Sequence, residues 1–138
     1  MQTVAAQPFC EVFLHLGDVI VVHRRSAQHL VPAGDLIGAG AFRANIALIY
    51  ALRGNFDRAW SLADQALEEL RGSDMIEYGK ALCKHGKIAH LAERPEAGAE
   101  ALNEAESVAK SRGATGDSEL GQAIGRLKAL MEEQTHAE

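Results

Sequence analysis

The sequence repeats itself at a spacing of 39 residues. Small side chains recur at that spacing in three copies: Ala47, Gly86 and Gly125. Further positions share the same offset: Ile46, His85 and Ile124, then Ala59 with Gly98, and Ala66 with Ala105. Repeats of this length are typical of stacked helix pairs, because one pair cannot bury its apolar face alone. Since such stacks present surfaces to partners, the spacing favours a binding module over an enzyme.

The composition agrees with an all-α fold. Of the 138 residues, 47% are hydrophobic but only 5% are aromatic, so Ala and Leu carry the core and suit close-packed helices. Only three prolines interrupt the chain, which allows long helices. The net charge of −5 argues against general nucleic-acid binding.

The cysteines and the apolar runs indicate where such a chain works. Cys10 and Cys83 have neither disulfide-framework nor metal-ligand spacing, so we expect two reduced thiols and no metal. The N-terminus lacks the early positive charge of a secretory signal. The most apolar run, Val19 to Val22, is too short to span a membrane. These features predict a cytoplasmic protein that does not enter a membrane.

Apolar periodicity and capping residues predict one domain over residues 1–138. A degenerate first helix pair covers 9–33, where Pro32 shortens the second helix; the β-branched run from Val19 to Val22 could instead be a strand. The best repeat covers 35–72 and the second 74–113, with Pro95 opening its second helix. A capping helix follows over 117–133, and the polar tail from Glu132 is expected to be loose.

The middle of the chain resembles the tetratricopeptide repeat, in a long-period form. Ile46-Ala47 stands at the position of that family's Leu-Gly pair, Tyr50 at its tyrosine, and 54–59 resembles its turn and small-residue start. Residues 81–110 are a weaker copy. The resemblance implies antiparallel helix pairs stacked as a short right-handed superhelix with a C-terminal capping helix, and a role in binding a protein or peptide.

A basic stripe is the main candidate for a partner site. Lys80, Lys84 and Lys87 are spaced i, i+4 and i+7, so they share one helix face. The resemblance implies that this face lines a concave groove, together with Asn45 in the preceding repeat and Arg126 in the last helix. A basic groove on an acidic protein would attract an acidic peptide. The alternative is that the lysines form an ordinary solvated face.

The first predicted helix is a candidate for self-association. It carries Phe9, Phe13, Val21 and Val22, which is more apolar surface than one neighbouring helix would cover. An exposed apolar face at the end of a stack favours docking to another chain. We therefore consider a homodimer through this end.

No motif indicates catalysis or a cofactor. There is no phosphate loop and no nucleophile elbow. Pairs such as His15 with Asp18, or Glu77 with His85, lack the third member of a catalytic set. The prediction is a non-catalytic adaptor or regulatory subunit; the alternative is a helical domain that senses a small molecule in a pocket between helices or assists an enzyme. Trp60 is either packed against the next repeat or an exposed anchor.

Overall fold

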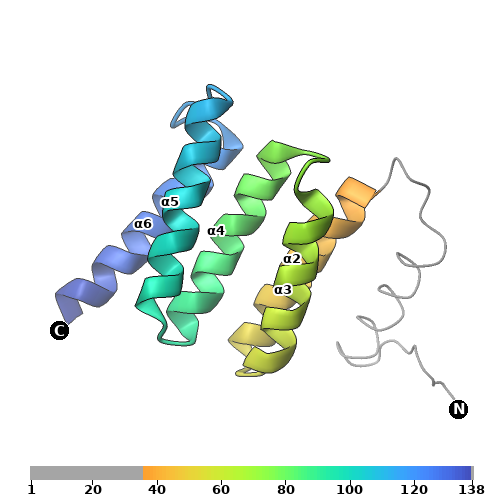
Figure 1. The fold of residues 1–138 in the computed structure, drawn as a ribbon. Helices are drawn as coiled ribbons and strands as arrows, with labels where there is room; N and C mark the ends of the chain where they lie inside the picture. Colours follow the sequence, from red (N-terminus) through yellow and green to blue (C-terminus); the bar gives the residue numbers. More distant parts are fainter. Residues whose placement is uncertain (1–35, 138) are drawn as a thin grey trace, which may run out of the picture. The chain divides into compact units, whose positions relative to one another are not determined.

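The computed structural model describes residues 36–137, and all regular structure there is α-helical (Figure 1). The described helices are α2 (Leu36–Leu52), α3 (Phe56–Leu70), α4 (Met75–Leu91), α5 (Pro95–Ser111) and α6 (Glu119–Ala137). The all-α prediction is thus confirmed for this part of the chain, which contains no strand. The helix pair expected over 9–33, and the run from Val19 to Val22, lie outside the described residues.

The turns follow the capping signals in the sequence. The Asn55 side chain accepts a hydrogen bond from the Arg58 amide, and that of Asp74 accepts one from the Glu77 amide at 3.0 Å, which starts α3 and α4. Gly54 and Gly72 each adopt a φ of 83°, a left-handed conformation that costs glycine little and ends the preceding helix. The helix boundaries around these turns agree with the prediction to within a few residues.

The C-terminal helix is longer than predicted. It begins after Ser118, whose hydroxyl accepts a hydrogen bond from the Gly121 amide at 3.0 Å, and it runs to Ala137 instead of ending near residue 133. The expectation of a loose tail from Glu132 is wrong. Residues 132–137 contain no Pro or Gly and include good helix formers, so nothing in the sequence stops the helix there.

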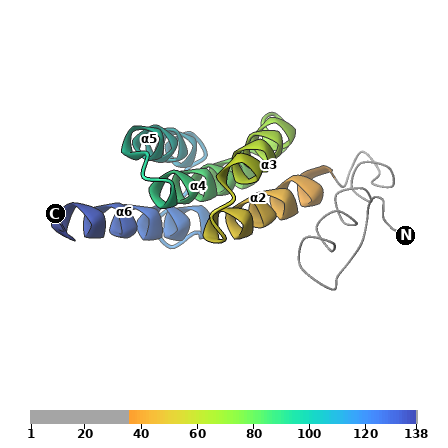
Figure 2. The same cartoon turned by 90° about the horizontal axis from the view of Figure 1, so that it is seen from below.

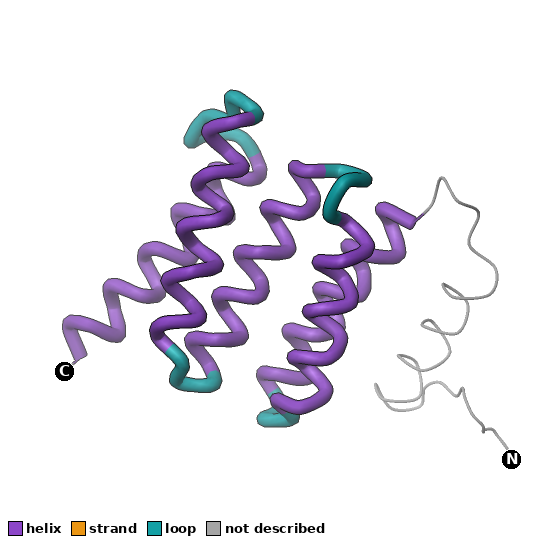
Figure 3. The backbone as a smooth tube through the Cα atoms, viewed as in Figure 1, coloured by secondary structure: helices purple, strands orange, loops and turns teal. Residues whose placement is uncertain are grey.

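Helix α4 is the centre of the packing. The chain divides at Gly40 into two units, and residues 40–138 form the unit described below. In it α4 packs against α3, α5 and α6, and α5 also contacts α6. The short turns make successive helices antiparallel (Figure 3). Helices α3 and α5 lie on one side of α4, and α2 and α6 lie on the other (Figure 2). The single domain over 1–138 stays a prediction.

The repeated small residues lie where helices touch, with one exception. Ala47, Ala59, Ala66 and Ala105 are fully buried, and Gly86 and Gly98 are buried as well. A side chain at Gly86 would lie 2.7 Å from Leu127 Cδ2, so the glycine allows α6 to approach α4 closely. The third copy, Gly125, is exposed with nothing near it. No described helix follows α6, so this position has no neighbour to accommodate.

Candidate functional site

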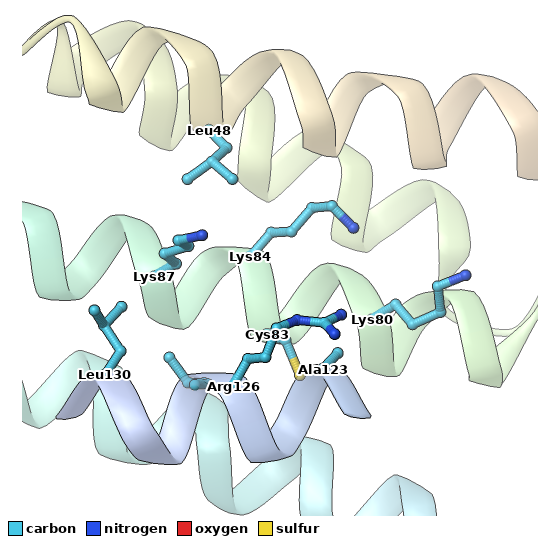
Figure 4. Close-up of a pocket in the computed structure, with 9 residues that line it drawn as sticks. Leu48, Lys80, Cys83, Lys84, Lys87, Ala123, Arg126 and Leu130 are labelled. Carbon is cyan, nitrogen blue, oxygen red and sulfur yellow. The ribbon is translucent and has the colours of Figure 1, made fainter. Parts of the chain in front are cut away.

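A pocket of about 160 Å³ opens between α2, α4 and α6 (Figure 4). We call it the cationic pocket. Its basic lining residues are Lys80, Lys84, Lys87 and Arg126. Its remaining lining residues are apolar or weakly polar: Leu48, Cys83, Ala123, Leu127 and Leu130. Four of the five residues predicted to bind a partner therefore line one site.

Two features bring these residues together: the spacing of the lysines along α4 and the close approach of α6 to α4. The i, i+4 and i+7 spacing on α4 puts the three lysines on one face. The close approach of α6 then brings Arg126 to that face, because Gly79 and Gly86 leave room for the side chains of Leu120 and Leu127. In Figure 4 Arg126 extends from α6 along α4, while Lys84 extends from α4 into the space toward α2.

Lys80 already pairs with two carboxylates. Its ammonium lies 2.9 Å from Glu77 Oε2 and 2.7 Å from Glu119 Oε1. The hydrogen bonds to Glu119 and then Glu77 raise the pKa of Lys80, and the bond to Lys80 lowers the pKa of Glu119. Lys80 therefore contributes less attraction to an arriving anion than its position suggests.

The other three cations have no acidic partner within the described residues. Lys84 is half-buried, whereas Lys87 and Arg126 are exposed, and none of them makes an ion pair there. Burial lowers the pKa of Lys84, and the positive charges of Lys80 and Arg126 lower it further; Glu77 partly opposes them. The site therefore holds uncompensated positive charge on a protein whose net charge is −5.

The thiol in the pocket is not a nucleophile. Cys83 is buried and free, and burial raises the pKa of its thiol to about 11, although Lys84 and Arg126 act in the opposite direction. Because the thiolate is the reactive form, this cysteine stays protonated and inert near neutral pH. Its role in the pocket is that of a small apolar wall.

Asn45, the fifth residue predicted to bind a partner, is not at the pocket. It is exposed on α2, and Leu48, nearly one turn further along, is the α2 residue that lines the site. Glu119, which binds Lys80, is a further residue of the site that the sequence pattern does not single out, although it follows Lys80 by the repeat spacing of 39. The proposed self-association residues, Phe9, Phe13, Val21 and Val22, lie outside the described residues.

Trp60 packs against the next helix pair. Its ring centroid lies 4.8 Å from that of His85, so the packed interpretation is confirmed. The His85 ring also places Nε2 3.2 Å from Asp64 Oδ1 on α3. The candidate pair of Glu77 with His85 is wrong, because the Glu77 carboxylate binds Lys80 while His85 contacts Asp64. His15 and Asp18 lie outside the described residues.

No group of three or more His, Cys, Asp or Glu residues between 36 and 137 is placed to hold a metal ion. None of the helices described is both long and apolar enough to cross a bilayer.

Comparison with known proteins gives no relative. No family model matches the chain, and no curated protein or solved structure matches it either. The resemblance to the tetratricopeptide repeat therefore gains no support from these comparisons and stays a prediction.

Proposed function

We propose that this chain is a non-catalytic binding module that holds an acidic side chain of a partner protein or peptide in the cationic pocket. The observation that supports this most is the convergence of Lys84, Lys87 and Arg126 on one pocket without acidic partners among the described residues. We further propose that the helix pairs belong to a tetratricopeptide-like right-handed stack, with α6 as its capping helix, working in the cytoplasm.

The energetics favour an anionic occupant. A half-buried ammonium such as that of Lys84 loses part of its hydration, and only the longer-range charge of Glu77 offsets this loss until an anion binds. Charge-assisted hydrogen bonds from Lys and Arg to a carboxylate are shorter and stronger than neutral ones. Arg126 adds a planar, multi-donor group that suits a carboxylate. The local positive charge would also speed the encounter with an acidic partner, although the net charge of the chain is −5.

The size of the pocket favours a side chain over a larger ligand. Sites for drug-sized molecules usually measure ~300–1,000 Å³, and this one measures about 160 Å³. Leu48, Leu127 and Leu130 line it beside the cations. This combination suits an acidic residue next to an aliphatic one in the partner, and it argues against the alternative of a domain that senses a larger small molecule.

A peptide-binding measurement tests this proposal. Fluorescent peptides that combine Asp or Glu with Leu at varied spacing are titrated with the protein, and anisotropy is recorded. Matched peptides replace each acid with its amide. We expect the acidic peptides to bind, the amide peptides to bind far more weakly, and added salt to reduce the affinity.

Two charge reversals of equal size provide the control. Lys87→Glu places a negative charge at the pocket, whereas Lys110→Glu makes the same change on an exposed part of α5 outside it. We expect Lys87→Glu to abolish most of the binding and Lys110→Glu to leave it nearly unchanged. Equal losses from both variants, or equal binding of acidic and amide peptides, would refute the proposal.

A further inference from the structure

We infer that Lys84 is a nucleophilic amine that captures small anionic aldehydes in the cationic pocket as an imine. This inference uses the same pocket as the proposed function but does not depend on any partner protein. Lys84 extends from α4 into the space toward α2, lines the pocket and is half-buried (Figure 4). It makes no ion pair in the described part of the chain.

Lys84 differs from every other lysine of the chain. The five lysines are Lys80, Lys84, Lys87, Lys110 and Lys128. Lys80 is held by Glu119 at 2.7 Å, and Lys128 is held by Glu106 at 2.6 Å. Lys87 and Lys110 are exposed to water. Lys84 alone combines partial burial with the absence of an ion pair among the described residues, and these conditions favour a neutral amine.

The electrostatics of the site support this difference. Burial and the neighbouring charges of Lys80 and Arg126 lower the pKa of Lys84, whereas ion pairs raise the pKa of Lys80 and of Lys128. A larger share of Lys84 is therefore unprotonated at neutral pH, and the unprotonated amine is the nucleophile. When the pKa of an amine falls by one, its unprotonated fraction at neutral pH rises about tenfold.

The rest of the pocket would hold the anionic end of the aldehyde. Lys87 and Arg126 line the same pocket and make no ion pair in the described part of the chain, so either can bind a carboxylate. A volume of about 160 Å³ suits a molecule of a few heavy atoms. Leu48 and Leu130 line the same pocket and give it an apolar part.

The reaction balances without an oxidant or reductant. The Lys84 nitrogen attacks the aldehyde carbon and gives a carbinolamine once a proton moves from nitrogen to oxygen. Loss of the oxygen as water then forms the C=N bond. The aldehyde carbon and the lysine nitrogen keep their oxidation states, and the only by-product is one water molecule.

Labelling with glyoxylate tests the inference. The intact protein is exposed briefly to glyoxylate with cyanoborohydride at neutral pH, which fixes any imine as a stable amine. Peptide mapping by mass spectrometry then compares the five lysines in the same sample, with the N-terminal amine scored separately. We expect Lys84 to be modified several times faster than Lys110, and its labelling to level off at a lower pH.

Two variants and a neutral aldehyde complete the experiment. Arg126→Gln should reduce labelling of Lys84 by glyoxylate more than labelling by neutral acetaldehyde, because only glyoxylate needs the guanidinium. Lys84→Arg should remove the fast labelling at this position and leave the labelling rates of the other lysines unchanged. Labelling of Lys84 no faster than that of Lys110 would overturn the inference. Binding of acidic peptides is measured separately, so the failure of either idea is recognised independently of the other.

Discussion

Replacing Gly121 with alanine should destabilise the protein, while the same change four residues later should stabilise it. Gly121 lies in the first turn of α6, directly against the loop that connects α5 to α6. A methyl group there would overlap the carbonyl oxygen of Thr115 and would lie 2.8 Å from Gly116 Cα. Gly125 lies on the same helix, is exposed, and has nothing within 4 Å of an added methyl group.

The expected changes in unfolding free energy follow from the surroundings of the two glycines. Gly→Ala in a helix gains about 1 kcal/mol from propensity alone, which is all that Gly125→Ala experiences. At Gly121 the methyl group meets backbone atoms, which cannot rotate away as a side chain can. Overpacking of this kind costs about 1–3 kcal/mol or more. Moving the loop would also strain the 2.7 Å hydrogen bond from Ser118 Oγ to the Thr115 carbonyl. Both variants gain the same propensity term, so we expect their stabilities to differ by the overpacking cost, about 1–3 kcal/mol or more.

Thermal and urea unfolding of both variants would measure this difference. In a domain of about 100 residues, 1 kcal/mol corresponds to roughly 4–8 °C in Tm. We therefore expect Gly121→Ala to melt below the wild type and Gly125→Ala to melt above it. If Gly121→Ala were as stable as Gly125→Ala, the loop would not approach α6 as described, and our account of how α6 begins would be wrong.

Three more predictions follow from single contacts. Tyr78 is fully buried and its hydroxyl donates to Glu104 Oε2 at 2.6 Å, so Tyr78→Phe should cost about 1–2 kcal/mol of unfolding free energy in urea titrations; no loss would contradict this role. Because burial raises the pKa of Cys83 from 9.0 to about 11, the folded state keeps a proton that the unfolded state releases. Unfolding free energy should therefore fall by up to about 3 kcal/mol between pH 9 and 11, and Cys83→Ala should remove this component; an unchanged profile would refute it. Glu119→Gln frees one side of Lys80 and should tighten the binding of acidic peptides by up to about fivefold, and weaker binding in anisotropy titrations would contradict this.

Much of the described fold could be predicted because its signals are local. Asn55 and Asp74 cap helices through their own side chains, and Gly54 and Gly72 end them through left-handed backbone. Each signal acts within a few residues and needs no knowledge of the tertiary fold. The polar composition from Glu132 onward predicts the wrong end for α6, because no residue there breaks a helix.

The candidate site was predictable only in part, because the residues that line the pocket depend on how the helices pack. The spacing of the lysines places them on one face whatever surrounds that face. The contribution of Leu48 in place of Asn45 depends on the rotation of α2, which the sequence pattern does not fix. The pairing of Lys80 with Glu119 joins α4 to α6 and becomes visible only when the two helices are side by side.

The central claim is that an acidic group binds between α4 and α6 beside Lys84, Lys87 and Arg126. Its most direct test is an NMR titration of the labelled protein with the tightest acidic peptide from the binding assay. We expect the largest shift changes along residues 80–87 and 123–130 and at Leu48, with high salt reversing them. Changes concentrated on α3 and α5, with the lysine face of α4 unaffected, would contradict the account.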